Sequence, residues 1–446
     1  QILLFQSGAT EDLGLWFLEG AGGMVGGVTY NADILQGDTA RMLRDRYLEL
    51  MSRVDADPTR TLAQLNGADA GAQDIASDDR AQDAVPGFAE MFQARVDRTP
   101  DATALTSQSW SIGYAELDGR ANRIAHCLRK RTGASRTVVG LAVEPGINRI
   151  AALIACLKTG ITCVLLDPAD GLAVLADRIA DSDVTVLMGD STLEAPLQWS
   201  RERALWFDVD NLELVAASAD APATVPATDD IAIAGYPHGY GAHPEAVGIT
   251  QRALGQMLGD LAATFAMPPS SRALVTARPS SPKAIVQHLL PLVSGAELIL
   301  TTDTEDLRQL VASRRPDYLF APAEAGAALQ AAGWKGQADL NAVCTGGSLA
   351  PETARQIGEC CQALWTLFGI TAVAPVAAAG KVENPAEGAH AGLPLAHADI
   401  QVLGPDDLPR PIGALGEVAI GGTLRSVPFG HRGSTHPVVP GLVRTG

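Results

Sequence analysis

From residue 86 onward, short runs of apolar residues alternate with longer segments in which apolar residues recur every three or four positions. Typical short runs are 138–143, 163–166 and 184–188, and the longer segment 147–159 lies between the first two. A run that is apolar at every position is typical of a strand covered on both faces, and the three-to-four spacing is typical of an amphipathic helix. The pattern therefore predicts an α/β fold built on parallel strands.

The same rhythm extends to about residue 390 and then becomes richer in strands. Further helices are predicted over 88–96, 118–130, 173–180, 254–265, 283–293, 306–313, 323–332 and 351–361. Further strands are predicted over 231–235, 246–249, 274–277, 298–301, 318–320, 342–344, 363–367, 399–403 and 416–420. The expected architecture is a layered αβ core with a β-rich C-terminal part.

The first 66 residues follow a different pattern. Strands are expected over 13–17 and 24–30, and a helix over 40–54, with Asp38 as its N-cap and Asp57-Pro58 ending it. This pattern predicts a small α+β unit.

A polar stretch separates the two patterns. Residues 67–85 contain Ala, Gly, Asp, Ser and Gln with almost no large apolar side chain, which is typical of a linker. The predicted domains are therefore 1–66, a linker over 67–85, and a core over 86–446.

Charge and cysteine usage narrow the classes of partner. The formal net charge of −18 argues against nucleic acid or an anionic membrane as the main partner, and no apolar run is long enough to span a bilayer. The six cysteines show no CxxC pairing, which favours free thiols in a reducing, cytoplasmic compartment. We therefore expect no nucleic-acid or membrane partner.

A glycine-containing loop stands out in the stretch 230–250. An apolar run leads into Gly239, Gly241 and Pro244, and a second apolar run follows. A strand feeding such a loop is typical of phosphate sites, because backbone N–H groups can approach an anion closely. The loop nevertheless carries Glu245 where a cation would help most.

Several motifs together resemble a known family. They are Gly113-Tyr-Ala-Glu-Leu117, Leu157-Lys-Thr-Gly-Ile-Thr-Cys-Val-Leu-Leu-Asp-Pro168, Thr345-Gly-Gly-Ser348, Gly416-Glu-Val-Ala-Ile-Gly-Gly422 and Val443-Arg-Thr-Gly446. Residues 86–446 resemble the large N-terminal core of a nonribosomal peptide synthetase adenylation domain, in the adenylate-forming (acyl-CoA synthetase-like) family. Residues 1–66 resemble the end of a condensation domain, with Tyr30-Asn-Ala-Asp-Ile34 matching its tail. The resemblance implies a condensation domain and a carrier protein of the same synthetase as partners.

The resemblance places a nucleotide site in the loop, but with altered chemistry. Tyr236, Gly239 and Pro244 match the family's phosphate loop, Gly241 lies within it, and Glu245 stands where the family has lysine. A carboxylate in place of an ammonium beside a triphosphate turns attraction into repulsion. Each such charge pair is worth roughly 4 kcal/mol at a few ångströms and an effective dielectric constant of about 20. Glu245 is interpreted either as an exposed carboxylate or as a new general base.

Two other nucleotide-site motifs are partly kept. Phe368 is expected to stack on adenine, and Gly369 and Thr371 are retained, but Ala372 replaces the glutamate that binds magnesium in the family. No metal ligand is therefore predicted. Further equivalents of the nucleotide site are Gly347, Ser348 and Arg444. The glycine turn at 346–348 either approaches a ligand through its backbone or is a tight turn without one. The family's smaller C-terminal lobe is not expected within this chain.

The residues that correspond to the family's substrate pocket differ most from the family's motifs. The family's aspartate, which holds the α-ammonium of an amino acid, is replaced by Pro282, and Lys283 and Val286 are the other pocket equivalents. Lys283 is interpreted either as a solvated or snorkelling lysine at a helix start or as an anchor for the carboxylate of a substrate.

Three functions remain open from the sequence. The first is a catalytically inactive pseudo-adenylation domain that serves as a platform between condensation and carrier or tailoring domains and needs no cofactor. The second is a divergent domain that uses ATP and Mg²⁺ to activate an unusual acid for loading on a carrier-protein phosphopantetheine. The third is a module that binds a ligand or a partner without catalysis.

Overall fold

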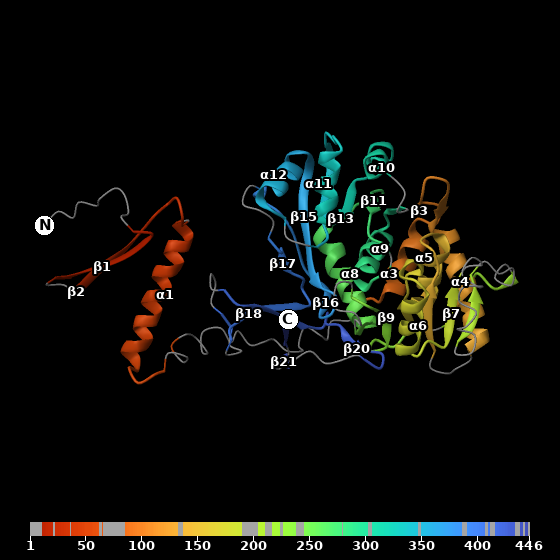
Figure 1. The fold of residues 1–446 in the computed structure, drawn as a ribbon, viewed down its shortest axis with the longest axis horizontal. Coiled ribbons are helices and arrows are strands. Elements are labelled where there is room, and N and C mark those ends of the chain that lie inside the picture. The colour runs from red at the N-terminus through yellow and green to blue at the C-terminus, as the bar shows by residue number, and fades with distance from the viewer. Residues whose placement is uncertain are drawn as a thin grey trace. The chain divides into compact units, whose positions relative to one another are not determined.

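The computed structural model describes most of the 446 residues. The described ranges are 11–20, 23–35, 37–61, 65, 85–132, 137–189, 204–209, 216–223, 226–237, 245–278, 280–301, 306–346, 349–385, 390–405, 409–410, 415–432, 438–439 and 442–444. The chain divides into two compact units, residues 1–76 with 401–417 and residues 77–400 with 418–446. Each unit is described by itself (Figure 1).

The first unit contains an antiparallel hairpin and a helix. Strand β1 (Leu13–Gly20) pairs with β2 (Gly23–Tyr30), and α1 (Gly37–Ala56) follows. Glycines of β2 face aromatic residues of β1: a Cβ atom on Gly26 would lie 2.6 Å from the Phe17 ring, and one on Gly27 would lie 2.6 Å from the Trp16 ring. The two glycines therefore make room for the rings that cover the hairpin.

The predicted elements of this unit are confirmed, with one correction. Helix α1 ends at Ala56, directly before Asp57-Pro58, as predicted. It begins at Gly37, so Asp38 lies in the first turn and the prediction of Asp38 as N-cap is wrong. The carboxylate still lies at the positive end of the helix dipole, and there it forms an ion pair with Arg41.

The second unit contains a seven-stranded sheet in the order β20-β10-β9-β6-β5-β7-β8. Its strands are β5 (Val138–Ala142), β6 (Thr162–Leu165), β7 (Val186–Gly189), β8 (Leu205–Asp208), β9 (Ile231–Gly235), β10 (Ala246–Thr250) and β20 (Val427–Phe429). The pairs from β9 to β8 are parallel, whereas β10 is antiparallel to both β9 and β20. The short connection between β9 and β10 explains the change, because parallel neighbours need a longer crossover.

A nine-stranded sheet in the order β17-β16-β15-β14-β13-β11-β12-β3-β4 forms the other half of this unit. Its strands are β3 (Thr103–Thr106), β4 (Ser111–Gly113), β11 (Arg272–Val275), β12 (Glu297–Leu300), β13 (Tyr318–Ala321), β14 (Gln337–Cys344), β15 (Cys361–Ile370), β16 (Ala374–Lys381) and β17 (Leu393–Pro394). The strands from β3 to β15 pair in parallel.

The C-terminal part adds β18 (Ala398–Leu403), β19 (Glu417–Gly422), β21 (Val438–Val439) and β22 (Leu442–Arg444). Strand β19 pairs with β22, and β22 pairs with β21.

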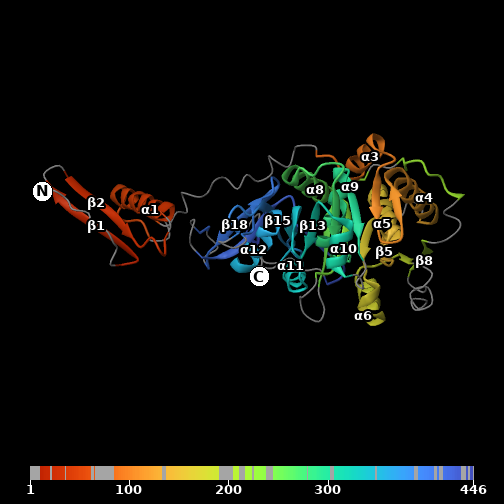
Figure 2. The ribbon, with the colours of Figure 1, turned by 90° about the horizontal axis from the view of Figure 1, so that it is seen from above.

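Helices cover both faces of these sheets, as the apolar strands predict. They are α3 (Phe88–Arg98), α4 (Tyr114–Thr132), α5 (Ile147–Thr159), α6 (Leu172–Asp181), α8 (Gln251–Phe265), α9 (Pro282–Ser294), α10 (Leu307–Arg314), α11 (Ala323–Ala331) and α12 (Pro351–Glu359), with a 3-10 turn at Pro168–Asp170. Alternate residues of one strand enter different cores: Leu165 joins the core around α5, whereas Val164 joins the core around α6. Figure 2 shows α4 and α6 on opposite sides of β5.

The predicted boundary between α12 and β15 is wrong. The helix expected to run to residue 361 ends at Glu359, and Cys361 opens β15 instead. Pairing with β14 draws the chain into the sheet, since the Gln337 N–H donates to the Cys360 carbonyl at 2.8 Å and Gln337 pairs with Cys361. Tertiary pairing here overrides the helical pattern of the local sequence.

Candidate functional site

The start of α9 carries the predicted substrate-pocket residues. Ser281 is the N-cap, and its hydroxyl accepts a hydrogen bond from the Ala284 N–H at 3.3 Å. Pro282 occupies the first helical position. There its fixed φ matches the geometry of the helix, and its missing N–H removes no hydrogen bond of the helix. Capping by Ser281 and Pro282 thus sets the position of Lys283 in the first turn of the helix.

Lys283 brings three predicted motifs together. Its Nζ atom donates a hydrogen bond to the Gly369 carbonyl at 3.1 Å. A Cβ atom on Gly346 would lie 3.5 Å from the same Nζ, and Gly346 has a φ of 139°, which favours glycine. We call Lys283, Gly346, Gly369 and the neighbouring Cys344 the Lys283 junction. The structure therefore joins the motifs that begin at Pro282, Thr345 and Phe368.

The Lys283 junction holds a half-buried cation. Burial lowers the pKa of Lys283, and the nearby Cys344 thiol partly opposes that shift. Burial also raises the pKa of Cys344, which favours the neutral thiol. In the part of the chain that the structure describes, Lys283 forms no ion pair with a carboxylate. The Lys283 side chain is therefore half-buried, with a backbone carbonyl as its described partner.

Strand β15 presents the Phe368 motif. Its pairing with β16 is irregular between Phe368 and Ile370, and a Cβ atom on Gly369 would collide with the Pro375 carbonyl. Phe368 packs against the small core cluster of Val373, Ala374, Ala377 and Ile420. Thr371 and Ala372 lie in the turn before β16, where the Thr371 carbonyl accepts a hydrogen bond from the Ser426 hydroxyl at 3.0 Å. Gly369 is thus required by the fold of the site itself.

The end of β9 lies against the same helix start. A Cβ atom on Gly235 would lie 2.9 Å from Cδ of Pro282, so the two segments approach closely. Glu245 lies directly before β10 and is half-buried. Val286, predicted in the substrate pocket, is fully buried and packs in the largest core cluster.

Five other predicted residues fall outside the described residues, and one is described only in its backbone. The five are Gly239, Gly241, Pro244, Gly347 and Ser348. Arg444 lies in β22, where it pairs with Ala419 of β19.

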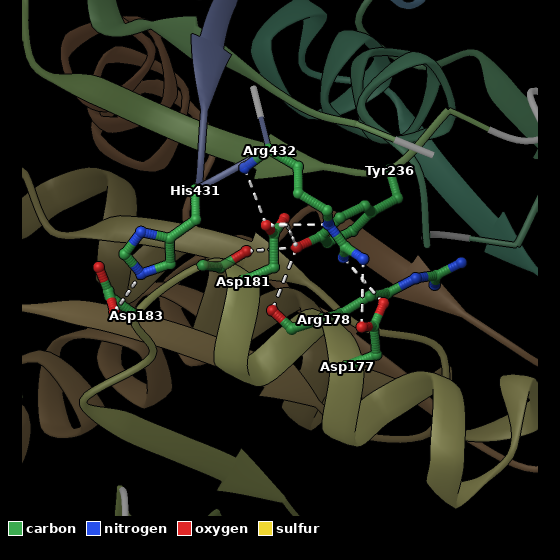
Figure 3. Close-up of polar contacts among 8 residues, drawn as sticks. Asp177, Arg178, Asp181, Asp183, Tyr236, His431 and Arg432 are labelled. Atoms are coloured by element: carbon green, nitrogen blue, oxygen red, sulfur yellow. Dashed lines mark hydrogen bonds and ion pairs between the residues drawn. The ribbon is translucent and has the colours of Figure 1, made fainter. Parts of the chain in front are cut away.

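Tyr236 has a structural role that its motif does not suggest (Figure 3). Its hydroxyl lies 2.8 Å from Oδ2 of Asp181 and 2.7 Å from the Ser182 hydroxyl, and the Arg178 guanidinium lies over its ring at 4.9 Å from the centroid. Burial raises the pKa of Tyr236, which keeps the phenol protonated. The Tyr236 side chain therefore anchors the end of β9 to α6.

Arg432 completes this anchor from the segment that follows β20. Its Nε atom donates to Oδ1 of Asp181 at 3.0 Å, and its terminal nitrogens bind Asp177 at 3.1 and 2.8 Å. Sequence reasoning missed Asp181 and Arg432, because about 250 residues separate them and neither belongs to a recognisable motif.

Sequence reasoning also missed an ion pair at the carboxyl end of β6. Arg278 donates to both carboxylate oxygens of Asp167, at 3.1 and 3.0 Å. Burial alone would raise the pKa of Asp167, but hydrogen bonds from the Ala169 N–H and the Arg278 guanidinium lower it below its ordinary value. The charge of Arg278 is therefore partnered, in contrast to that of Lys283.

No group of three or more His, Cys, Asp or Glu side chains within the described ranges lies close enough to hold a metal ion. The side chain of Ala372 carries no donor atom.

The comparisons with known proteins define the class. A family model described as "AMP-binding enzyme" matches residues 92–426, and the chain therefore belongs to the AMP-binding enzyme family. The match runs from within α3 to the segment before β20 and includes the Lys283 junction.

Relatives among characterised proteins are large synthetases. The chain is 25% identical over 438 residues to one component of the linear gramicidin synthase of Brevibacillus parabrevis, an alignment that covers 92% of this chain and 6% of the relative. It is 28% identical over 413 residues to the phosphinothricin tripeptide synthetase PhsC of Streptomyces viridochromogenes, an alignment that covers 88% of this chain and 37% of the relative. The chain thus spans less than a tenth of the length of the gramicidin synthase components that it matches.

Solved structures confirm the adenylate-forming α/β fold. A four-domain nonribosomal peptide synthetase bound to AMP and glycine matches with a TM-score of 0.80 at 23% identity, covering 98% of this chain and 34% of that one. A long-chain-fatty-acid-CoA ligase from Archaeoglobus fulgidus matches with a TM-score of 0.69 at 17% identity, covering 78% of this chain and 77% of that one. A search of the described helices finds none that is long and apolar enough to cross a membrane.

Proposed function

We propose that this chain is an adenylation-type core of a nonribosomal peptide synthetase that has lost the activation of amino acids with ATP. Its role is that of a structural platform between a condensation domain and the carrier or tailoring domains of the same synthetase. The similarity to synthetases such as linear gramicidin synthase supports the synthetase context. Residues 1–66, including β1, β2 and α1, are proposed as the end of the condensation domain.

The observation that carries this proposal is the cation at the Lys283 junction. The α-ammonium of an amino acid bound at the start of α9 would meet the Lys283 ammonium, with Pro282 in place of a carboxylate. Two like charges at about 4 Å repel by roughly 4 kcal/mol at an effective dielectric constant of about 20. Such a site disfavours the binding of any amino acid in its usual charged form.

The residues of the nucleotide site also support the proposal that activation with ATP has been lost. Ala372 has no carboxylate to hold the magnesium ion that accompanies ATP, and Glu245 brings a negative charge to the segment where phosphates would bind. The framework around these positions is intact, with both sheets formed and the Tyr236 anchor in place. Loss of chemistry with retention of the fold is what a platform requires.

The test is ATP–pyrophosphate exchange with a full panel of proteinogenic amino acids, run on the full-length protein. We expect no exchange above a reaction without enzyme. Circular dichroism and a cooperative melting transition serve as the control that the protein is folded. Robust exchange with any amino acid would overturn the proposal.

The same lysine favours a second candidate function. A divergent adenylation domain could activate an acid that lacks an α-ammonium, with Lys283 attracting its carboxylate before the carboxylate oxygen attacks the α-phosphorus of ATP and pyrophosphate leaves. Exchange with hydroxy, keto or aryl acids in the presence of ATP and Mg²⁺, but with no amino acid, would favour this candidate over the platform.

A further inference from the structure

A short segment at the edge of the seven-stranded sheet, residues 423–432, connects α8 with α6. We call it the strap, and it includes β20, which pairs with β10 through three residues. The middle residue, Pro428, has no backbone N–H to donate, and a strand this short with a proline is held only weakly at a sheet edge. The position of β20 therefore depends on the contacts at the two ends of the strap.

The first end of the strap is fixed by neutral contacts. The Thr423 hydroxyl donates to Oε1 of Gln256 in α8 at 2.6 Å, and the Ser426 N–H donates to the Val373 carbonyl at 2.6 Å. Leu424 is fully buried in the largest core cluster. Hydrogen bonds and a buried side chain thus fasten this end to the core.

The other end of the strap closes on α6 (Figure 3). The His431 N–H donates to the Asp181 carbonyl at 2.9 Å, and the backbone N–H and Nε of Arg432 both donate to Oδ1 of Asp181 at 3.0 Å. Gly430 has a φ of 73°, and a Cβ atom there would lie 2.8 Å from Oδ2 of Asp181. Residues 430–432 therefore fit closely around one carboxylate.

The end of α6 is unfavourable without the strap. Asp177 and Asp181 lie four residues apart at the C-terminal end of the helix, where each is repelled by the other and by the negative end of the helix dipole. Asp183 has a φ of 48°, in the left-handed region that disfavours residues with a side chain. Arg432 binds the first two carboxylates, and the His431 ring lies 2.9 Å from the third. The local structure of α6 therefore suits the strap and not an isolated helix end.

The Asp181 carboxylate depends on Arg432 for its counter-charge. Its side chain is only 3% exposed, and its other described contact is to the neutral Tyr236 hydroxyl. Arg178, the other cation close by, pairs with Asp170 and lies over the Tyr236 ring. A buried carboxylate that loses its cation is strongly disfavoured, so the ion pair of Arg432 with Asp181 opposes the release of the strap.

We propose that residues 430–432 form a latch, with the C-terminal end of α6 as its catch, and that the latch opens as a local unit while the rest of the second unit stays folded. Closure holds β20 on β10 and keeps Asp181 in contact with Tyr236 at the end of β9. Opening releases β20 and uncovers the edge of β10. The latch goes beyond the proposed platform function and depends neither on ATP nor on a substrate.

Hydrogen–deuterium exchange of the full-length protein, read by mass spectrometry, tests the latch. Arg432→Gln should accelerate exchange at least tenfold in the peptide that contains β20 and residues 430–432, because it leaves Asp181 buried without its cation. Exchange in α5 should stay unchanged. The matched control is Arg425→Gln in the same strap, whose described hydrogen bond goes to the Gly422 carbonyl and which should leave both peptides unchanged. Wild-type exchange of β20 in Arg432→Gln, or equal acceleration in α5, overturns the proposal.

A second variant opens the latch without changing a charge. Gly430→Ala places a Cβ atom against the Asp181 carboxylate at a positive φ. We expect trypsin to cleave after Arg432 at least tenfold faster in Gly430→Ala than in the wild type, at a temperature at which circular dichroism shows both to be folded. His431→Gln, which removes only the exposed side-chain contact to Asp183, should change the cleavage rate less than threefold. Wild-type cleavage in folded Gly430→Ala contradicts the latch.

Arg432→Lys takes the place of Arg432→Gln if the latter does not fold. A lysine keeps the positive charge but cannot contact both carboxylates with a planar fork, so exchange of β20 should still accelerate at least threefold. Neither measurement involves ATP or an amino acid. Failure of the latch therefore leaves the platform proposal untouched, and pyrophosphate exchange with an amino acid would refute the platform alone.

Discussion

Two lysines of the second unit are held in opposite ways. Lys158 of α5 is 4% exposed, forms an ion pair with Asp118, and donates to Asn122 at 2.9 Å and to Gln93 at 3.1 Å. Lys283 of α9 is half-buried and contacts one backbone carbonyl. The first lysine joins α3, α4 and α5 in a closed network, whereas the second has no carboxylate partner among the described residues.

The difference separates a charge that belongs to the fold from one for which we propose a role in the site. Asn122 donates to Asp118 at 2.8 Å, so each group around Lys158 already has a partner within the protein. Fully satisfied buried networks of this kind rigidify a fold. The following predictions test that contrast.

Lys158→Met should have the largest effect. It leaves the Asp118 carboxylate buried without its cation, and breaking such a pair costs about 3–5 kcal/mol of unfolding free energy. Denaturant titration measures the loss. The matched control is Lys130→Met at an exposed lysine of α4, for which we expect a change within about 0.5 kcal/mol. Equal effects of the two substitutions would show that the Lys158 network is not structural.

His288 should make stability depend on acid pH. It is fully buried in α9, and burial, with a smaller contribution from the nearby Arg149 charge, lowers its pKa from 6.5 to about 4. Its Nδ1 atom lies 2.7 Å from the Ala284 carbonyl, as expected of a neutral ring that donates through Nδ1. Because the unfolded chain binds a proton that the folded chain rejects, His288 costs no stability above pH 6.5 and lowers it progressively as the pH falls to 4.

The measurement is the unfolding free energy at pH 7.5 and pH 4.5 for wild type and His288→Leu. The wild type should lose up to about 3 kcal/mol more than the variant over this range. His390→Leu, at an exposed histidine, should keep the wild-type dependence. A variant with the same slope as the wild type would argue against a buried neutral His288.

Tyr236→Phe should have an intermediate effect. It removes the hydroxyl that contacts Asp181 and Ser182, and we expect a loss of about 1–2 kcal/mol. A double-mutant cycle with Asp181→Asn measures the coupling, and the double variant should lose less than the sum of the two single losses. Full additivity would mean that the two groups do not act together.

Lys283→Met should have the smallest effect on stability. The substitution removes the cost of burying an unpaired ammonium and also removes the hydrogen bond to Gly369, so the two terms oppose each other. We expect a change within about 1 kcal/mol in the denaturant titration used for Lys158→Met. A loss as large as that of Lys158→Met would make Lys283 a structural residue.

Local sequence patterns predict much of this fold. The helix over 147–159 and the strand over 231–235 are confirmed at both ends, because their apolar spacing and flanking residues agree with their tertiary surroundings. The ends of α12 and β15 are not predicted, since strand pairing between Gln337 and Cys361 decides them. The antiparallel direction of β10 likewise depends on the closure of a loop and not on composition.

The candidate site is predicted only in part. Motif spacing points to Pro282, Lys283, Gly369 and Ala372, and the structure brings Lys283 and Gly369 into contact. The sequence alone could not show that Lys283 is half-buried, because its burial depends on which distant segments cover α9. The inactivity of the domain stays a prediction, and the exchange assay tests it.

The most direct measurement is the titration of Lys283 itself. The chain contains only five lysines, so lysine labelled with ¹³C at Cε gives few NMR signals, and the Lys283→Met variant identifies the one from Lys283. We predict that Lys283 titrates below its ordinary value of 10.5, because burial disfavours its charged form more than the nearby Cys344 favours it. A pKa at or above 10.5 would contradict the account of the Lys283 junction.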